Sequence, residues 1–267
     1  MKATIADHQR QQPLANNQLS LVVGQVRFPP IPRFSENGYT LPFEDAMREQ
    51  FPKASREPQI NVVITDNEVK TVHGAELLRF ADLHDHYTVV LAADFIALEC
   101  RSYDTFEEFN ARFLLIVDLA GKYFEIKYRL RIGIRYINEL RWEKATTYAK
   151  WQEFLNPDFM GWDAIAKLGG TMQQTIAEFA TKRDDGGTFR LRRGFLTGTT
   201  IPPVKNFRLP IPPEFYLIDL DYSSEDPLPL NQGLPELTKL YHDFIETVFF
   251  EMTGNAELQQ YLKGNPS

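Results

Sequence analysis

The chain of 267 residues has very little cysteine and no long apolar run. Its single cysteine, Cys100, excludes an intrachain disulfide and any zinc or iron–sulfur site that is built from several cysteines. No stretch approaches the roughly 18 consecutive apolar residues of a membrane-spanning helix, and residues 1–17 hold no apolar run of the kind that signal peptides use. We therefore expect a protein that has no membrane segment and works in the cytoplasm.

The sequence also lacks the common motifs of enzymes. It has no phosphate-binding loop, no glycine-rich dinucleotide fingerprint, no nucleophile elbow and no His-Glu-x-x-His helix. The net charge is −7, from 29 basic and 36 acidic residues, so the surface as a whole does not attract nucleic acid or anionic membranes. We predict no catalytic residue, no metal site and no cofactor, and we favour a protein that is not an enzyme.

What the sequence does contain is typical of a folded globular protein. Hydrophobic residues make up 43% of the chain and aromatic residues 13%, with 20 Phe and 11 Tyr. This mixture excludes intrinsic disorder. A chain of this length can also bury a large core without disulfides.

Hydrophobic periodicity predicts more strands than helices. Strands are expected at 19–28, 60–64, 77–83, 87–98, 128–138, 188–196 and 215–222, and helices at 42–51, 104–120 and 235–252. The segment 142–160 is aromatic and irregular, and 170–180 fits a short helix or a strand equally well. Strands and helices alternate too sparsely for a doubly wound parallel sheet. We therefore expect an α+β fold, with a curved, mainly antiparallel sheet and two long helices on one face.

The domain organisation allows two interpretations. A strand followed by a long helix at 87–122 is echoed at 215–253, which would follow from two related halves. Amphipathic helices after strands are also common in unrelated segments. The expected division is a loose segment 1–17, an α+β half at 18–160 and an α+β half at 161–267, or else one continuous domain.

Several stretches carry a resemblance to a known family. They are QVRF at 25–28, LAADFIALE at 91–99 followed by Tyr103 and FEEF at 106–109, and RIGIRYIN at 131–138, with a similar terminal helix LYHDFIETVFFEMT at 240–253. With them the chain resembles a sporadically distributed prokaryotic family of about 250 residues that has no assigned function, so the resemblance implies no activity and no site residue.

The most informative polar feature is the pair Arg131 and Arg135. These residues share one face of a strand about 13 Å apart, with a glycine between them that leaves the backbone open. Arg27 has the same parity in its own strand and joins them if the strands are neighbours. The arginines either form a concave basic surface that binds an anion or a partner, or they pair with carboxylates such as Glu99 and Glu139. If they are exposed, changing Arg131 and Arg135 to alanine should barely affect folding.

A second basic cluster is formed by Arg190, Arg192 and Arg193. Residues 182–208 hold seven basic and two acidic side chains, whereas 214–251 hold nine acidic side chains and one lysine. The cluster allows three interpretations. It lies on a solvated edge hairpin, where its charge hinders pairing with further strands, or it binds RNA, or it contacts a charged partner or a second copy.

Asp219 and Asp221 share one face of a predicted strand. Together with Arg131 and Arg135 they could hold a divalent cation and a phosphate, as in a phosphohydrolase. The plainer interpretation is that they belong to an acidic outer face of the sheet.

The histidines and the cysteine are weaker candidates. His84 and His86 flank a tight turn and invite a metal or general-base role, but no third ligand follows from the sequence. His242 lies beside the apolar stripe of the last helix, and Cys100 has the character of a small buried hydrophobe.

Two classes of function remain ahead of the phosphohydrolase. The first is a non-enzymatic binding or adaptor protein that acts through protein–protein contacts, such as an antitoxin-like partner or an accessory protein of a defence locus. The alternative is an RNA-binding protein or metal-independent endoribonuclease, with His84 or His86 as general base and the arginines of 190–193 on phosphate. We favour the first and expect a protein partner or self-association, with RNA as the alternative and no membrane.

Overall fold

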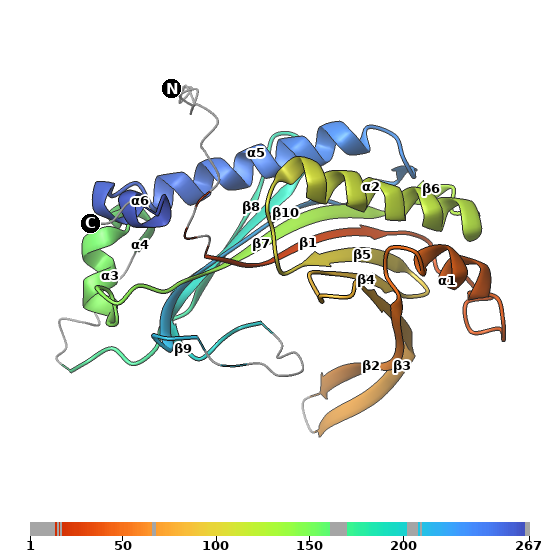
Figure 1. Cartoon of the computed structure of the whole chain (residues 1–267), viewed down its shortest axis with the longest axis horizontal. Helices are drawn as coiled ribbons and strands as arrows, with labels where there is room; N and C mark the ends of the chain where they lie inside the picture. The colour runs from red at the N-terminus through yellow and green to blue at the C-terminus, as the bar shows by residue number, and fades with distance from the viewer. Residues whose placement is uncertain are drawn as a thin grey trace.

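A computed structural model of the chain describes residues 14, 16, 18–65, 68–160, 170–201, 208 and 210–264. Within these residues nine strands form one antiparallel sheet, and long helices pack on one of its faces (Figure 1). The fold is therefore α+β, as the sequence predicts. The expected loose segment 1–17 lies almost entirely outside the described residues.

The strands of the large sheet are β1 (Leu19–Arg27), β2 (Lys53–Thr65), β3 (Glu68–Ala81), β4 (Tyr87–Leu91), β5 (Phe95–Cys100), β7 (Arg131–Leu140), β8 (Ala177–Lys182), β9 (Thr188–Thr197) and β10 (Glu214–Ser224). A short two-stranded sheet pairs β6 (Tyr128–Arg129) with β11 (Leu228–Pro229). The helices are α1 (Leu41–Met47), α2 (Phe106–Tyr123), α3 (Tyr148–Phe154), α4 (Pro157–Met160), α5 (Leu234–Met252) and α6 (Ala256–Leu262). None of the helices in the described part of the chain combines the length and the apolar character that a membrane span requires.

The strand order of the large sheet repeats itself about its centre. The order is β2-β3-β4-β5-β1-β7-β10-β9-β8, so β1 and β7 lie antiparallel in the middle. Outward from β1 the order is β5, β4, β3, and outward from β7 it is β10, β9, β8. A long helix follows β5 and another follows β10. The two halves of the continuous sheet thus share this strand order, except that β2 adds a strand beyond β3. The expected division at 160 and 161 stays a prediction.

The sheet is bent, and its two faces are unlike. Helices α2 and α5 lie side by side on one face (Figure 1). The β2–β3 hairpin and the C-terminal end of β9 reach away from the helices, whereas Phe189 at the start of β9 packs on Phe244 of α5. The face without helices is therefore the inner face of an arch, and we call it the open face.

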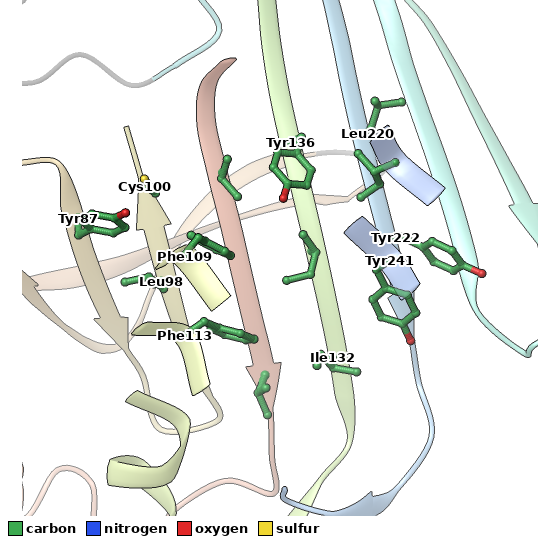
Figure 2. Close-up of a cluster of buried hydrophobic side chains, with 14 of the residues drawn as sticks. Tyr87, Leu98, Cys100, Phe109, Phe113, Ile132, Tyr136, Leu220, Tyr222 and Tyr241 are labelled. Atoms are coloured by element: carbon green, nitrogen blue, oxygen red, sulfur yellow. The ribbon is translucent and has the colours of Figure 1, made fainter. Parts of the chain in front are cut away.

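The main core lies between the sheet and the two long helices, and a smaller buried cluster that includes Leu21, Ile137 and Phe215 lies on the open face. Helix α2 begins after Thr105, whose side chain accepts a hydrogen bond from the Glu108 N–H, so the helix starts slightly later than the expected range 104–120. Its stripe of apolar side chains, which includes Phe109 and Phe113, is buried against the sheet (Figure 2). Gly24 in β1 makes room for this contact, because a Cβ there would lie 2.9 Å from the Phe113 ring.

Several expected elements differ from the structure. Strand β3 begins at Glu68 rather than at 77, and α1 ends at Met47 rather than at 51. The predicted strand 87–98 is two strands, β4 and β5, because Ala92 donates its N–H to the Phe95 carbonyl (2.9 Å) and closes a turn that has no glycine or proline. Strand β2 begins at Lys53 rather than at 60, since its charged first half still pairs with β3. The irregular region 142–160 contains α3 and α4. The undecided segment 170–180 leads into strand β8.

Candidate functional site

The open face carries many of the charged side chains of the sheet. Because side chains alternate between the two faces of a strand, the residues that pack under the helices leave their neighbours on the open face. Opposite charges come together there, and among the described residues six arginines lie on the same face as six carboxylates: Arg27, Arg79, Arg131, Arg135, Arg190 and Arg192, with Glu57, Asp94, Glu99, Glu178, Asp219 and Asp221. The expected concave surface therefore carries both signs of charge.

The centre of this face is a cluster of two arginines and two aspartates. Arg135 in β7 donates two hydrogen bonds to Asp219 in β10, Nε to Oδ1 at 2.7 Å and Nη2 to Oδ2 at 2.6 Å. The Nη2 atom of Arg131 lies 3.7 Å from Oδ1 of Asp221. The prediction that these four residues lie together is confirmed, because β7 and β10 are neighbouring strands. The bidentate geometry fixes both Arg135 and Asp219 in one orientation.

Burial decides the electrostatics of this cluster. The side chain of Asp219 is only 6% exposed and that of Arg135 is 38% exposed. The hydrogen bonds to Asp219 raise the pKa of the Arg135 guanidinium above its usual value, although burial opposes this. Burial raises the pKa of the Asp221 carboxyl, and the charges of Arg131 and Arg135 only partly offset the effect. Asp219 is therefore a structural counter-ion, whereas Asp221 is the less satisfied carboxylate.

Arg27 joins the same face, as expected from its parity. It lies directly opposite Arg131 across the β1–β7 pair, a juxtaposition of like charges that is unfavourable by itself. The two side chains lean apart, because Arg27 bonds Asp94 at 2.6 Å and Arg131 donates to Gln25 at 3.0 Å. The partners of the three arginines are thus Asp94, Gln25 and the β10 aspartates, not Glu99 and Glu139.

The second basic cluster is split between the two faces. Arg192 bonds Glu178 of β8 at 3.2 Å on the open face. Arg190 is exposed there, opposite Asp221, and has no ion pair within the described residues. The assignment of Arg193 to this surface was wrong: its side chain points to the helix side, where it is 8% exposed and donates to the Met160 carbonyl at 2.7 Å.

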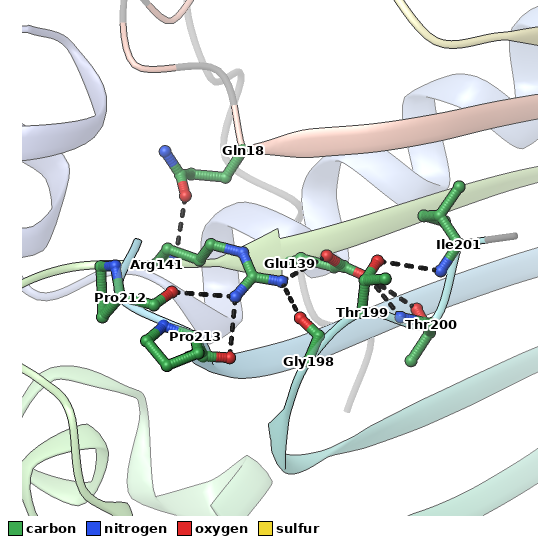
Figure 3. Close-up of polar contacts among 9 residues, drawn as sticks. All are labelled: Gln18, Glu139, Arg141, Gly198, Thr199, Thr200, Ile201, Pro212 and Pro213. Carbon is green, nitrogen blue, oxygen red and sulfur yellow. Dashed lines mark hydrogen bonds and ion pairs between the residues drawn. The ribbon is translucent and has the colours of Figure 1, made fainter. Parts of the chain in front are cut away.

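A buried ion pair fixes the edge of the open face near β7 (Figure 3). Arg141 donates to Glu139 at 2.7 Å and to the carbonyls of Gly198, Pro212 and Pro213 at 2.6, 3.0 and 2.9 Å. Arg141 thereby holds both ends of the connection between β9 and β10 against β7.

The carboxylate of Glu139 is satisfied by the same connection. It accepts from the Thr199 hydroxyl and from the Thr200 N–H and hydroxyl. Burial alone would raise the pKa of Glu139, but these bonds and the one from Arg141 outweigh it and lower the pKa.

Gln25 and Arg141 were not among the predicted site residues. Both could have been found from the alternation of side chains along a strand. Gln25 shares its face with Arg27, and Arg141 has the same parity as Arg131 and Arg135. Arg79 was missed for a different reason. It bonds Glu57 at 3.1 Å and Glu99 at 3.2 Å, contacts that depend on strand neighbours which the sequence does not give.

The histidines and the cysteine lie away from the open-face cluster. His84 and His86 occupy the predicted turn between β3 and β4, with ring centroids 5.4 Å apart. His242 packs in the core, stacked on Phe106 and hydrogen-bonded to the Tyr136 hydroxyl at 2.9 Å. Burial lowers the pKa of His242 to about 4 and raises the pKa of the Cys100 thiol to about 11.

In the described part of the chain, no three His, Cys, Asp or Glu side chains come together as a metal site would need. A hollow of about 480 Å³ is lined by residues such as Phe51 and Phe80, and another of about 680 Å³ by residues such as Asn156 and Phe250. Neither contains the arginine–aspartate cluster. Comparison of the chain with protein-family profiles and with curated proteins finds no match, so the resemblance to the sporadic prokaryotic family stays a prediction.

Proposed function

We propose that the protein is a non-enzymatic binding protein that acts through protein–protein contacts, and that its open face is the contact surface. The observation that carries this proposal is the set of ion pairs between opposite charges on the sheet face that lies away from α2 and α5. A surface with both signs of charge fits another folded protein, whose surface also mixes both signs. It does not fit a polyanion, which is bound by excess positive charge.

The fixed geometry of the face supports the same proposal. Side chains that already hold one another need not be ordered when a partner binds, so the entropy cost of association is lower. Arg135 and Asp219 are held by two bonds, and Arg131 by Gln25 and Asp221. The exposed Arg190 offers a charge that a partner's carboxylate can bind directly.

The geometry argues against the endoribonuclease alternative. His84 and His86 lie at the β3–β4 turn, while Arg190 and Arg192 lie on β9. Five strand spacings separate β4 from β9 in the sheet order, which is about 24 Å at the usual spacing. Since a general base must lie within hydrogen-bond reach of the proton that it removes, these residues do not form one site.

The phosphohydrolase alternative is also disfavoured. Both oxygens of Asp219 are already bonded to Arg135. A cation at Asp219 and Asp221 would have to displace this bidentate pair and would meet two guanidinium groups. The cluster is better suited to holding the sheet face in shape than to chemistry.

A pull-down from cells of the native host tests the proposal. The open-face variant carries Arg27→Glu and Arg190→Glu, because both side chains are exposed and neither holds a buried partner. The matched control carries Arg48→Glu and Lys239→Glu, the same change of charge at the C-cap of α1 and on α5. We expect the wild type and the control to recover one protein in stoichiometric amount, and the open-face variant to lose it.

Recovery of the bare chain by all three proteins would contradict the proposal. Nucleic acid that co-purifies with the wild type, seen as a raised ratio of absorbance at 260 and 280 nm, would favour the RNA-binding alternative instead.

A further inference from the structure

The two edges of the large sheet are built differently. Edge strand β2 contains Pro58, which has no backbone N–H, and its pairing with β3 shifts register between Pro58 and Ile60. Both features hinder the pairing of an edge strand with a further strand. Edge strand β8 has neither proline nor bulge, and within the described residues it pairs only with β9. The β8 edge is therefore open to another strand.

The hydrogen bonds at the ends of β8 show which backbone groups face outward. Thr175 donates its N–H to the Phe195 carbonyl at 2.9 Å, and Arg183 donates to the Gly187 carbonyl at 2.8 Å. Successive residues of an antiparallel strand direct their N–H and C=O groups to opposite sides. Odd-numbered residues of β8 therefore face β9. Glu178, Ala180 and Lys182 present their backbone groups at the free edge.

The outward residues are complementary to themselves. When two copies of β8 pair antiparallel about a two-fold axis at Ala180, Ala180 lies opposite its own copy and Glu178 lies opposite Lys182 of the second copy. All of these are hydrogen-bonded pairs, because the outward backbone groups belong to the same three residues. The charges also match, since each Glu178 meets a lysine and each Lys182 a glutamate.

This pairing would add contacts to side chains of β8 that are exposed in the single chain. Lys182 is exposed and has no charged partner within the described residues, while Glu178 is half exposed beside Arg192. On the other face of the strand, Phe179 is 49% exposed. In the paired arrangement Phe179 lies diagonally across from Phe179 of the second copy, at a distance that aromatic rings can bridge.

We infer that the protein forms a symmetric homodimer through antiparallel pairing of β8 with β8 of a second copy. The sheets of the two copies then become one continuous sheet, with both open faces on the same side. This surface is separate from the centre of the open face, so the inference stands or falls independently of the proposed function.

A cysteine placed on the two-fold axis tests the inference most directly. In hydrogen-bonded antiparallel pairs the Cα atoms lie about 5.5 Å apart, within the range that a disulfide bridges. Ala180→Cys should therefore form a covalent dimer under mild oxidation, seen on a non-reducing gel. Glu178→Cys is the matched control, because its copy would lie about 14 Å away across the axis. The native Cys100 is buried and does not interfere.

Sedimentation over a wide range of protein concentration gives the second test. Ala180→Pro removes an outward N–H without removing a bond to β9, and it should yield a folded monomer. Lys182→Glu places like charges opposite one another and should weaken dimerisation about tenfold or more. Adding Glu178→Lys to it should restore the dimer. Lys263→Glu, the same charge change on an exposed residue after α6, should have no effect.

A wild type that stays monomeric at every concentration would overturn the inference. So would a dimer that is indifferent to Lys182→Glu, or equal cross-linking of Ala180→Cys and Glu178→Cys. The charge-reversal pair keeps the test decisive if the proline variant does not fold.

Discussion

Changing Glu139 to glutamine perturbs the buried ion pair that holds the β9–β10 connection in place (Figure 3). The side chain of Glu139 is 3% exposed and that of Arg141 is 9% exposed. Glutamine has nearly the same shape, but it removes the charge that faces the guanidinium. It also turns an amide NH₂ toward donors such as the Thr200 N–H, which is 2.6 Å from the carboxylate. A buried arginine is left without its counter-charge.

Breaking a buried pair by removing one partner costs about 3–5 kcal/mol. For a chain of this size each kcal/mol lowers the melting temperature by about 2–4 °C. Glu139→Gln should therefore lower it by about 6–20 °C. Lys239→Ala is the control, since it breaks the exposed pair with Asp243, a helical pair that is worth only about 0.3–0.5 kcal/mol.

The effect should also depend on pH, with a definite sign. The pKa of Glu139 is lowered in the folded protein from a reference value of 4.5. The stability that its charge contributes is therefore fully present above about pH 4.5, and it is lost as the pH falls through the folded pKa. Urea unfolding at several pH values should show the wild type and Glu139→Gln converging in acid. Equal unfolding midpoints at pH 7 would refute the reasoning.

Three further outcomes follow from burial on the two faces of the sheet. Arg135→Ala should lower the free energy of unfolding by about 1–3 kcal/mol, because it leaves the buried Asp219 unpaired, and Asp219→Asn in the same chain should recover part of the loss in urea titrations. The free energy of unfolding of the wild type should fall by about 2 kcal/mol between pH 7 and pH 5, because the unfolded chain protonates His242 near pH 6.5 and the folded protein only near pH 4. His242→Phe should reduce this dependence on pH, and an unchanged slope of stability against pH would contradict the burial of His242. Cys100, buried and with a pKa of about 11, should react with a thiol reagent at pH 7 only after unfolding in urea, so rapid labelling of the native protein would show that its burial is wrong.

The Arg135 outcome revises an expectation from the sequence. Strand parity correctly puts Arg131 and Arg135 on the face away from the helices, and from that exposure alone their removal should hardly matter. The alternation of side chains along a strand does not show how deeply the carboxylate that pairs with an arginine is buried. Asp219 is almost fully buried beneath Arg135, and this depends on how closely β7 and β10 pack.

Other structural features also depend either on residues close in sequence, which makes them predictable, or on the packing of distant segments, which does not. The two long helices and most strands follow from periodicity, which depends on residues close in sequence. The alternation of side chains along a strand puts the neighbouring Arg192 and Arg193 on opposite faces. That Arg193 is the buried one depends on the packing of distant segments such as α4, whose Met160 carbonyl it contacts. The turn at Ala92 was missed because it lacks the glycine or proline that marks most turns.

The most direct test of the central claim compares partner recovery between the two faces of the sheet. Tagged wild-type protein, the open-face variant Arg27→Glu with Arg190→Glu, and the helix-side control Arg48→Glu with Lys239→Glu are purified in parallel, after thermal melts have shown that all three are equally folded. We expect the wild type and the control each to retain one protein partner in stoichiometric amount, and we expect this partner to be released by high salt and absent from the open-face variant. Equal recovery by all three proteins, or no partner on any of them, would contradict this expectation.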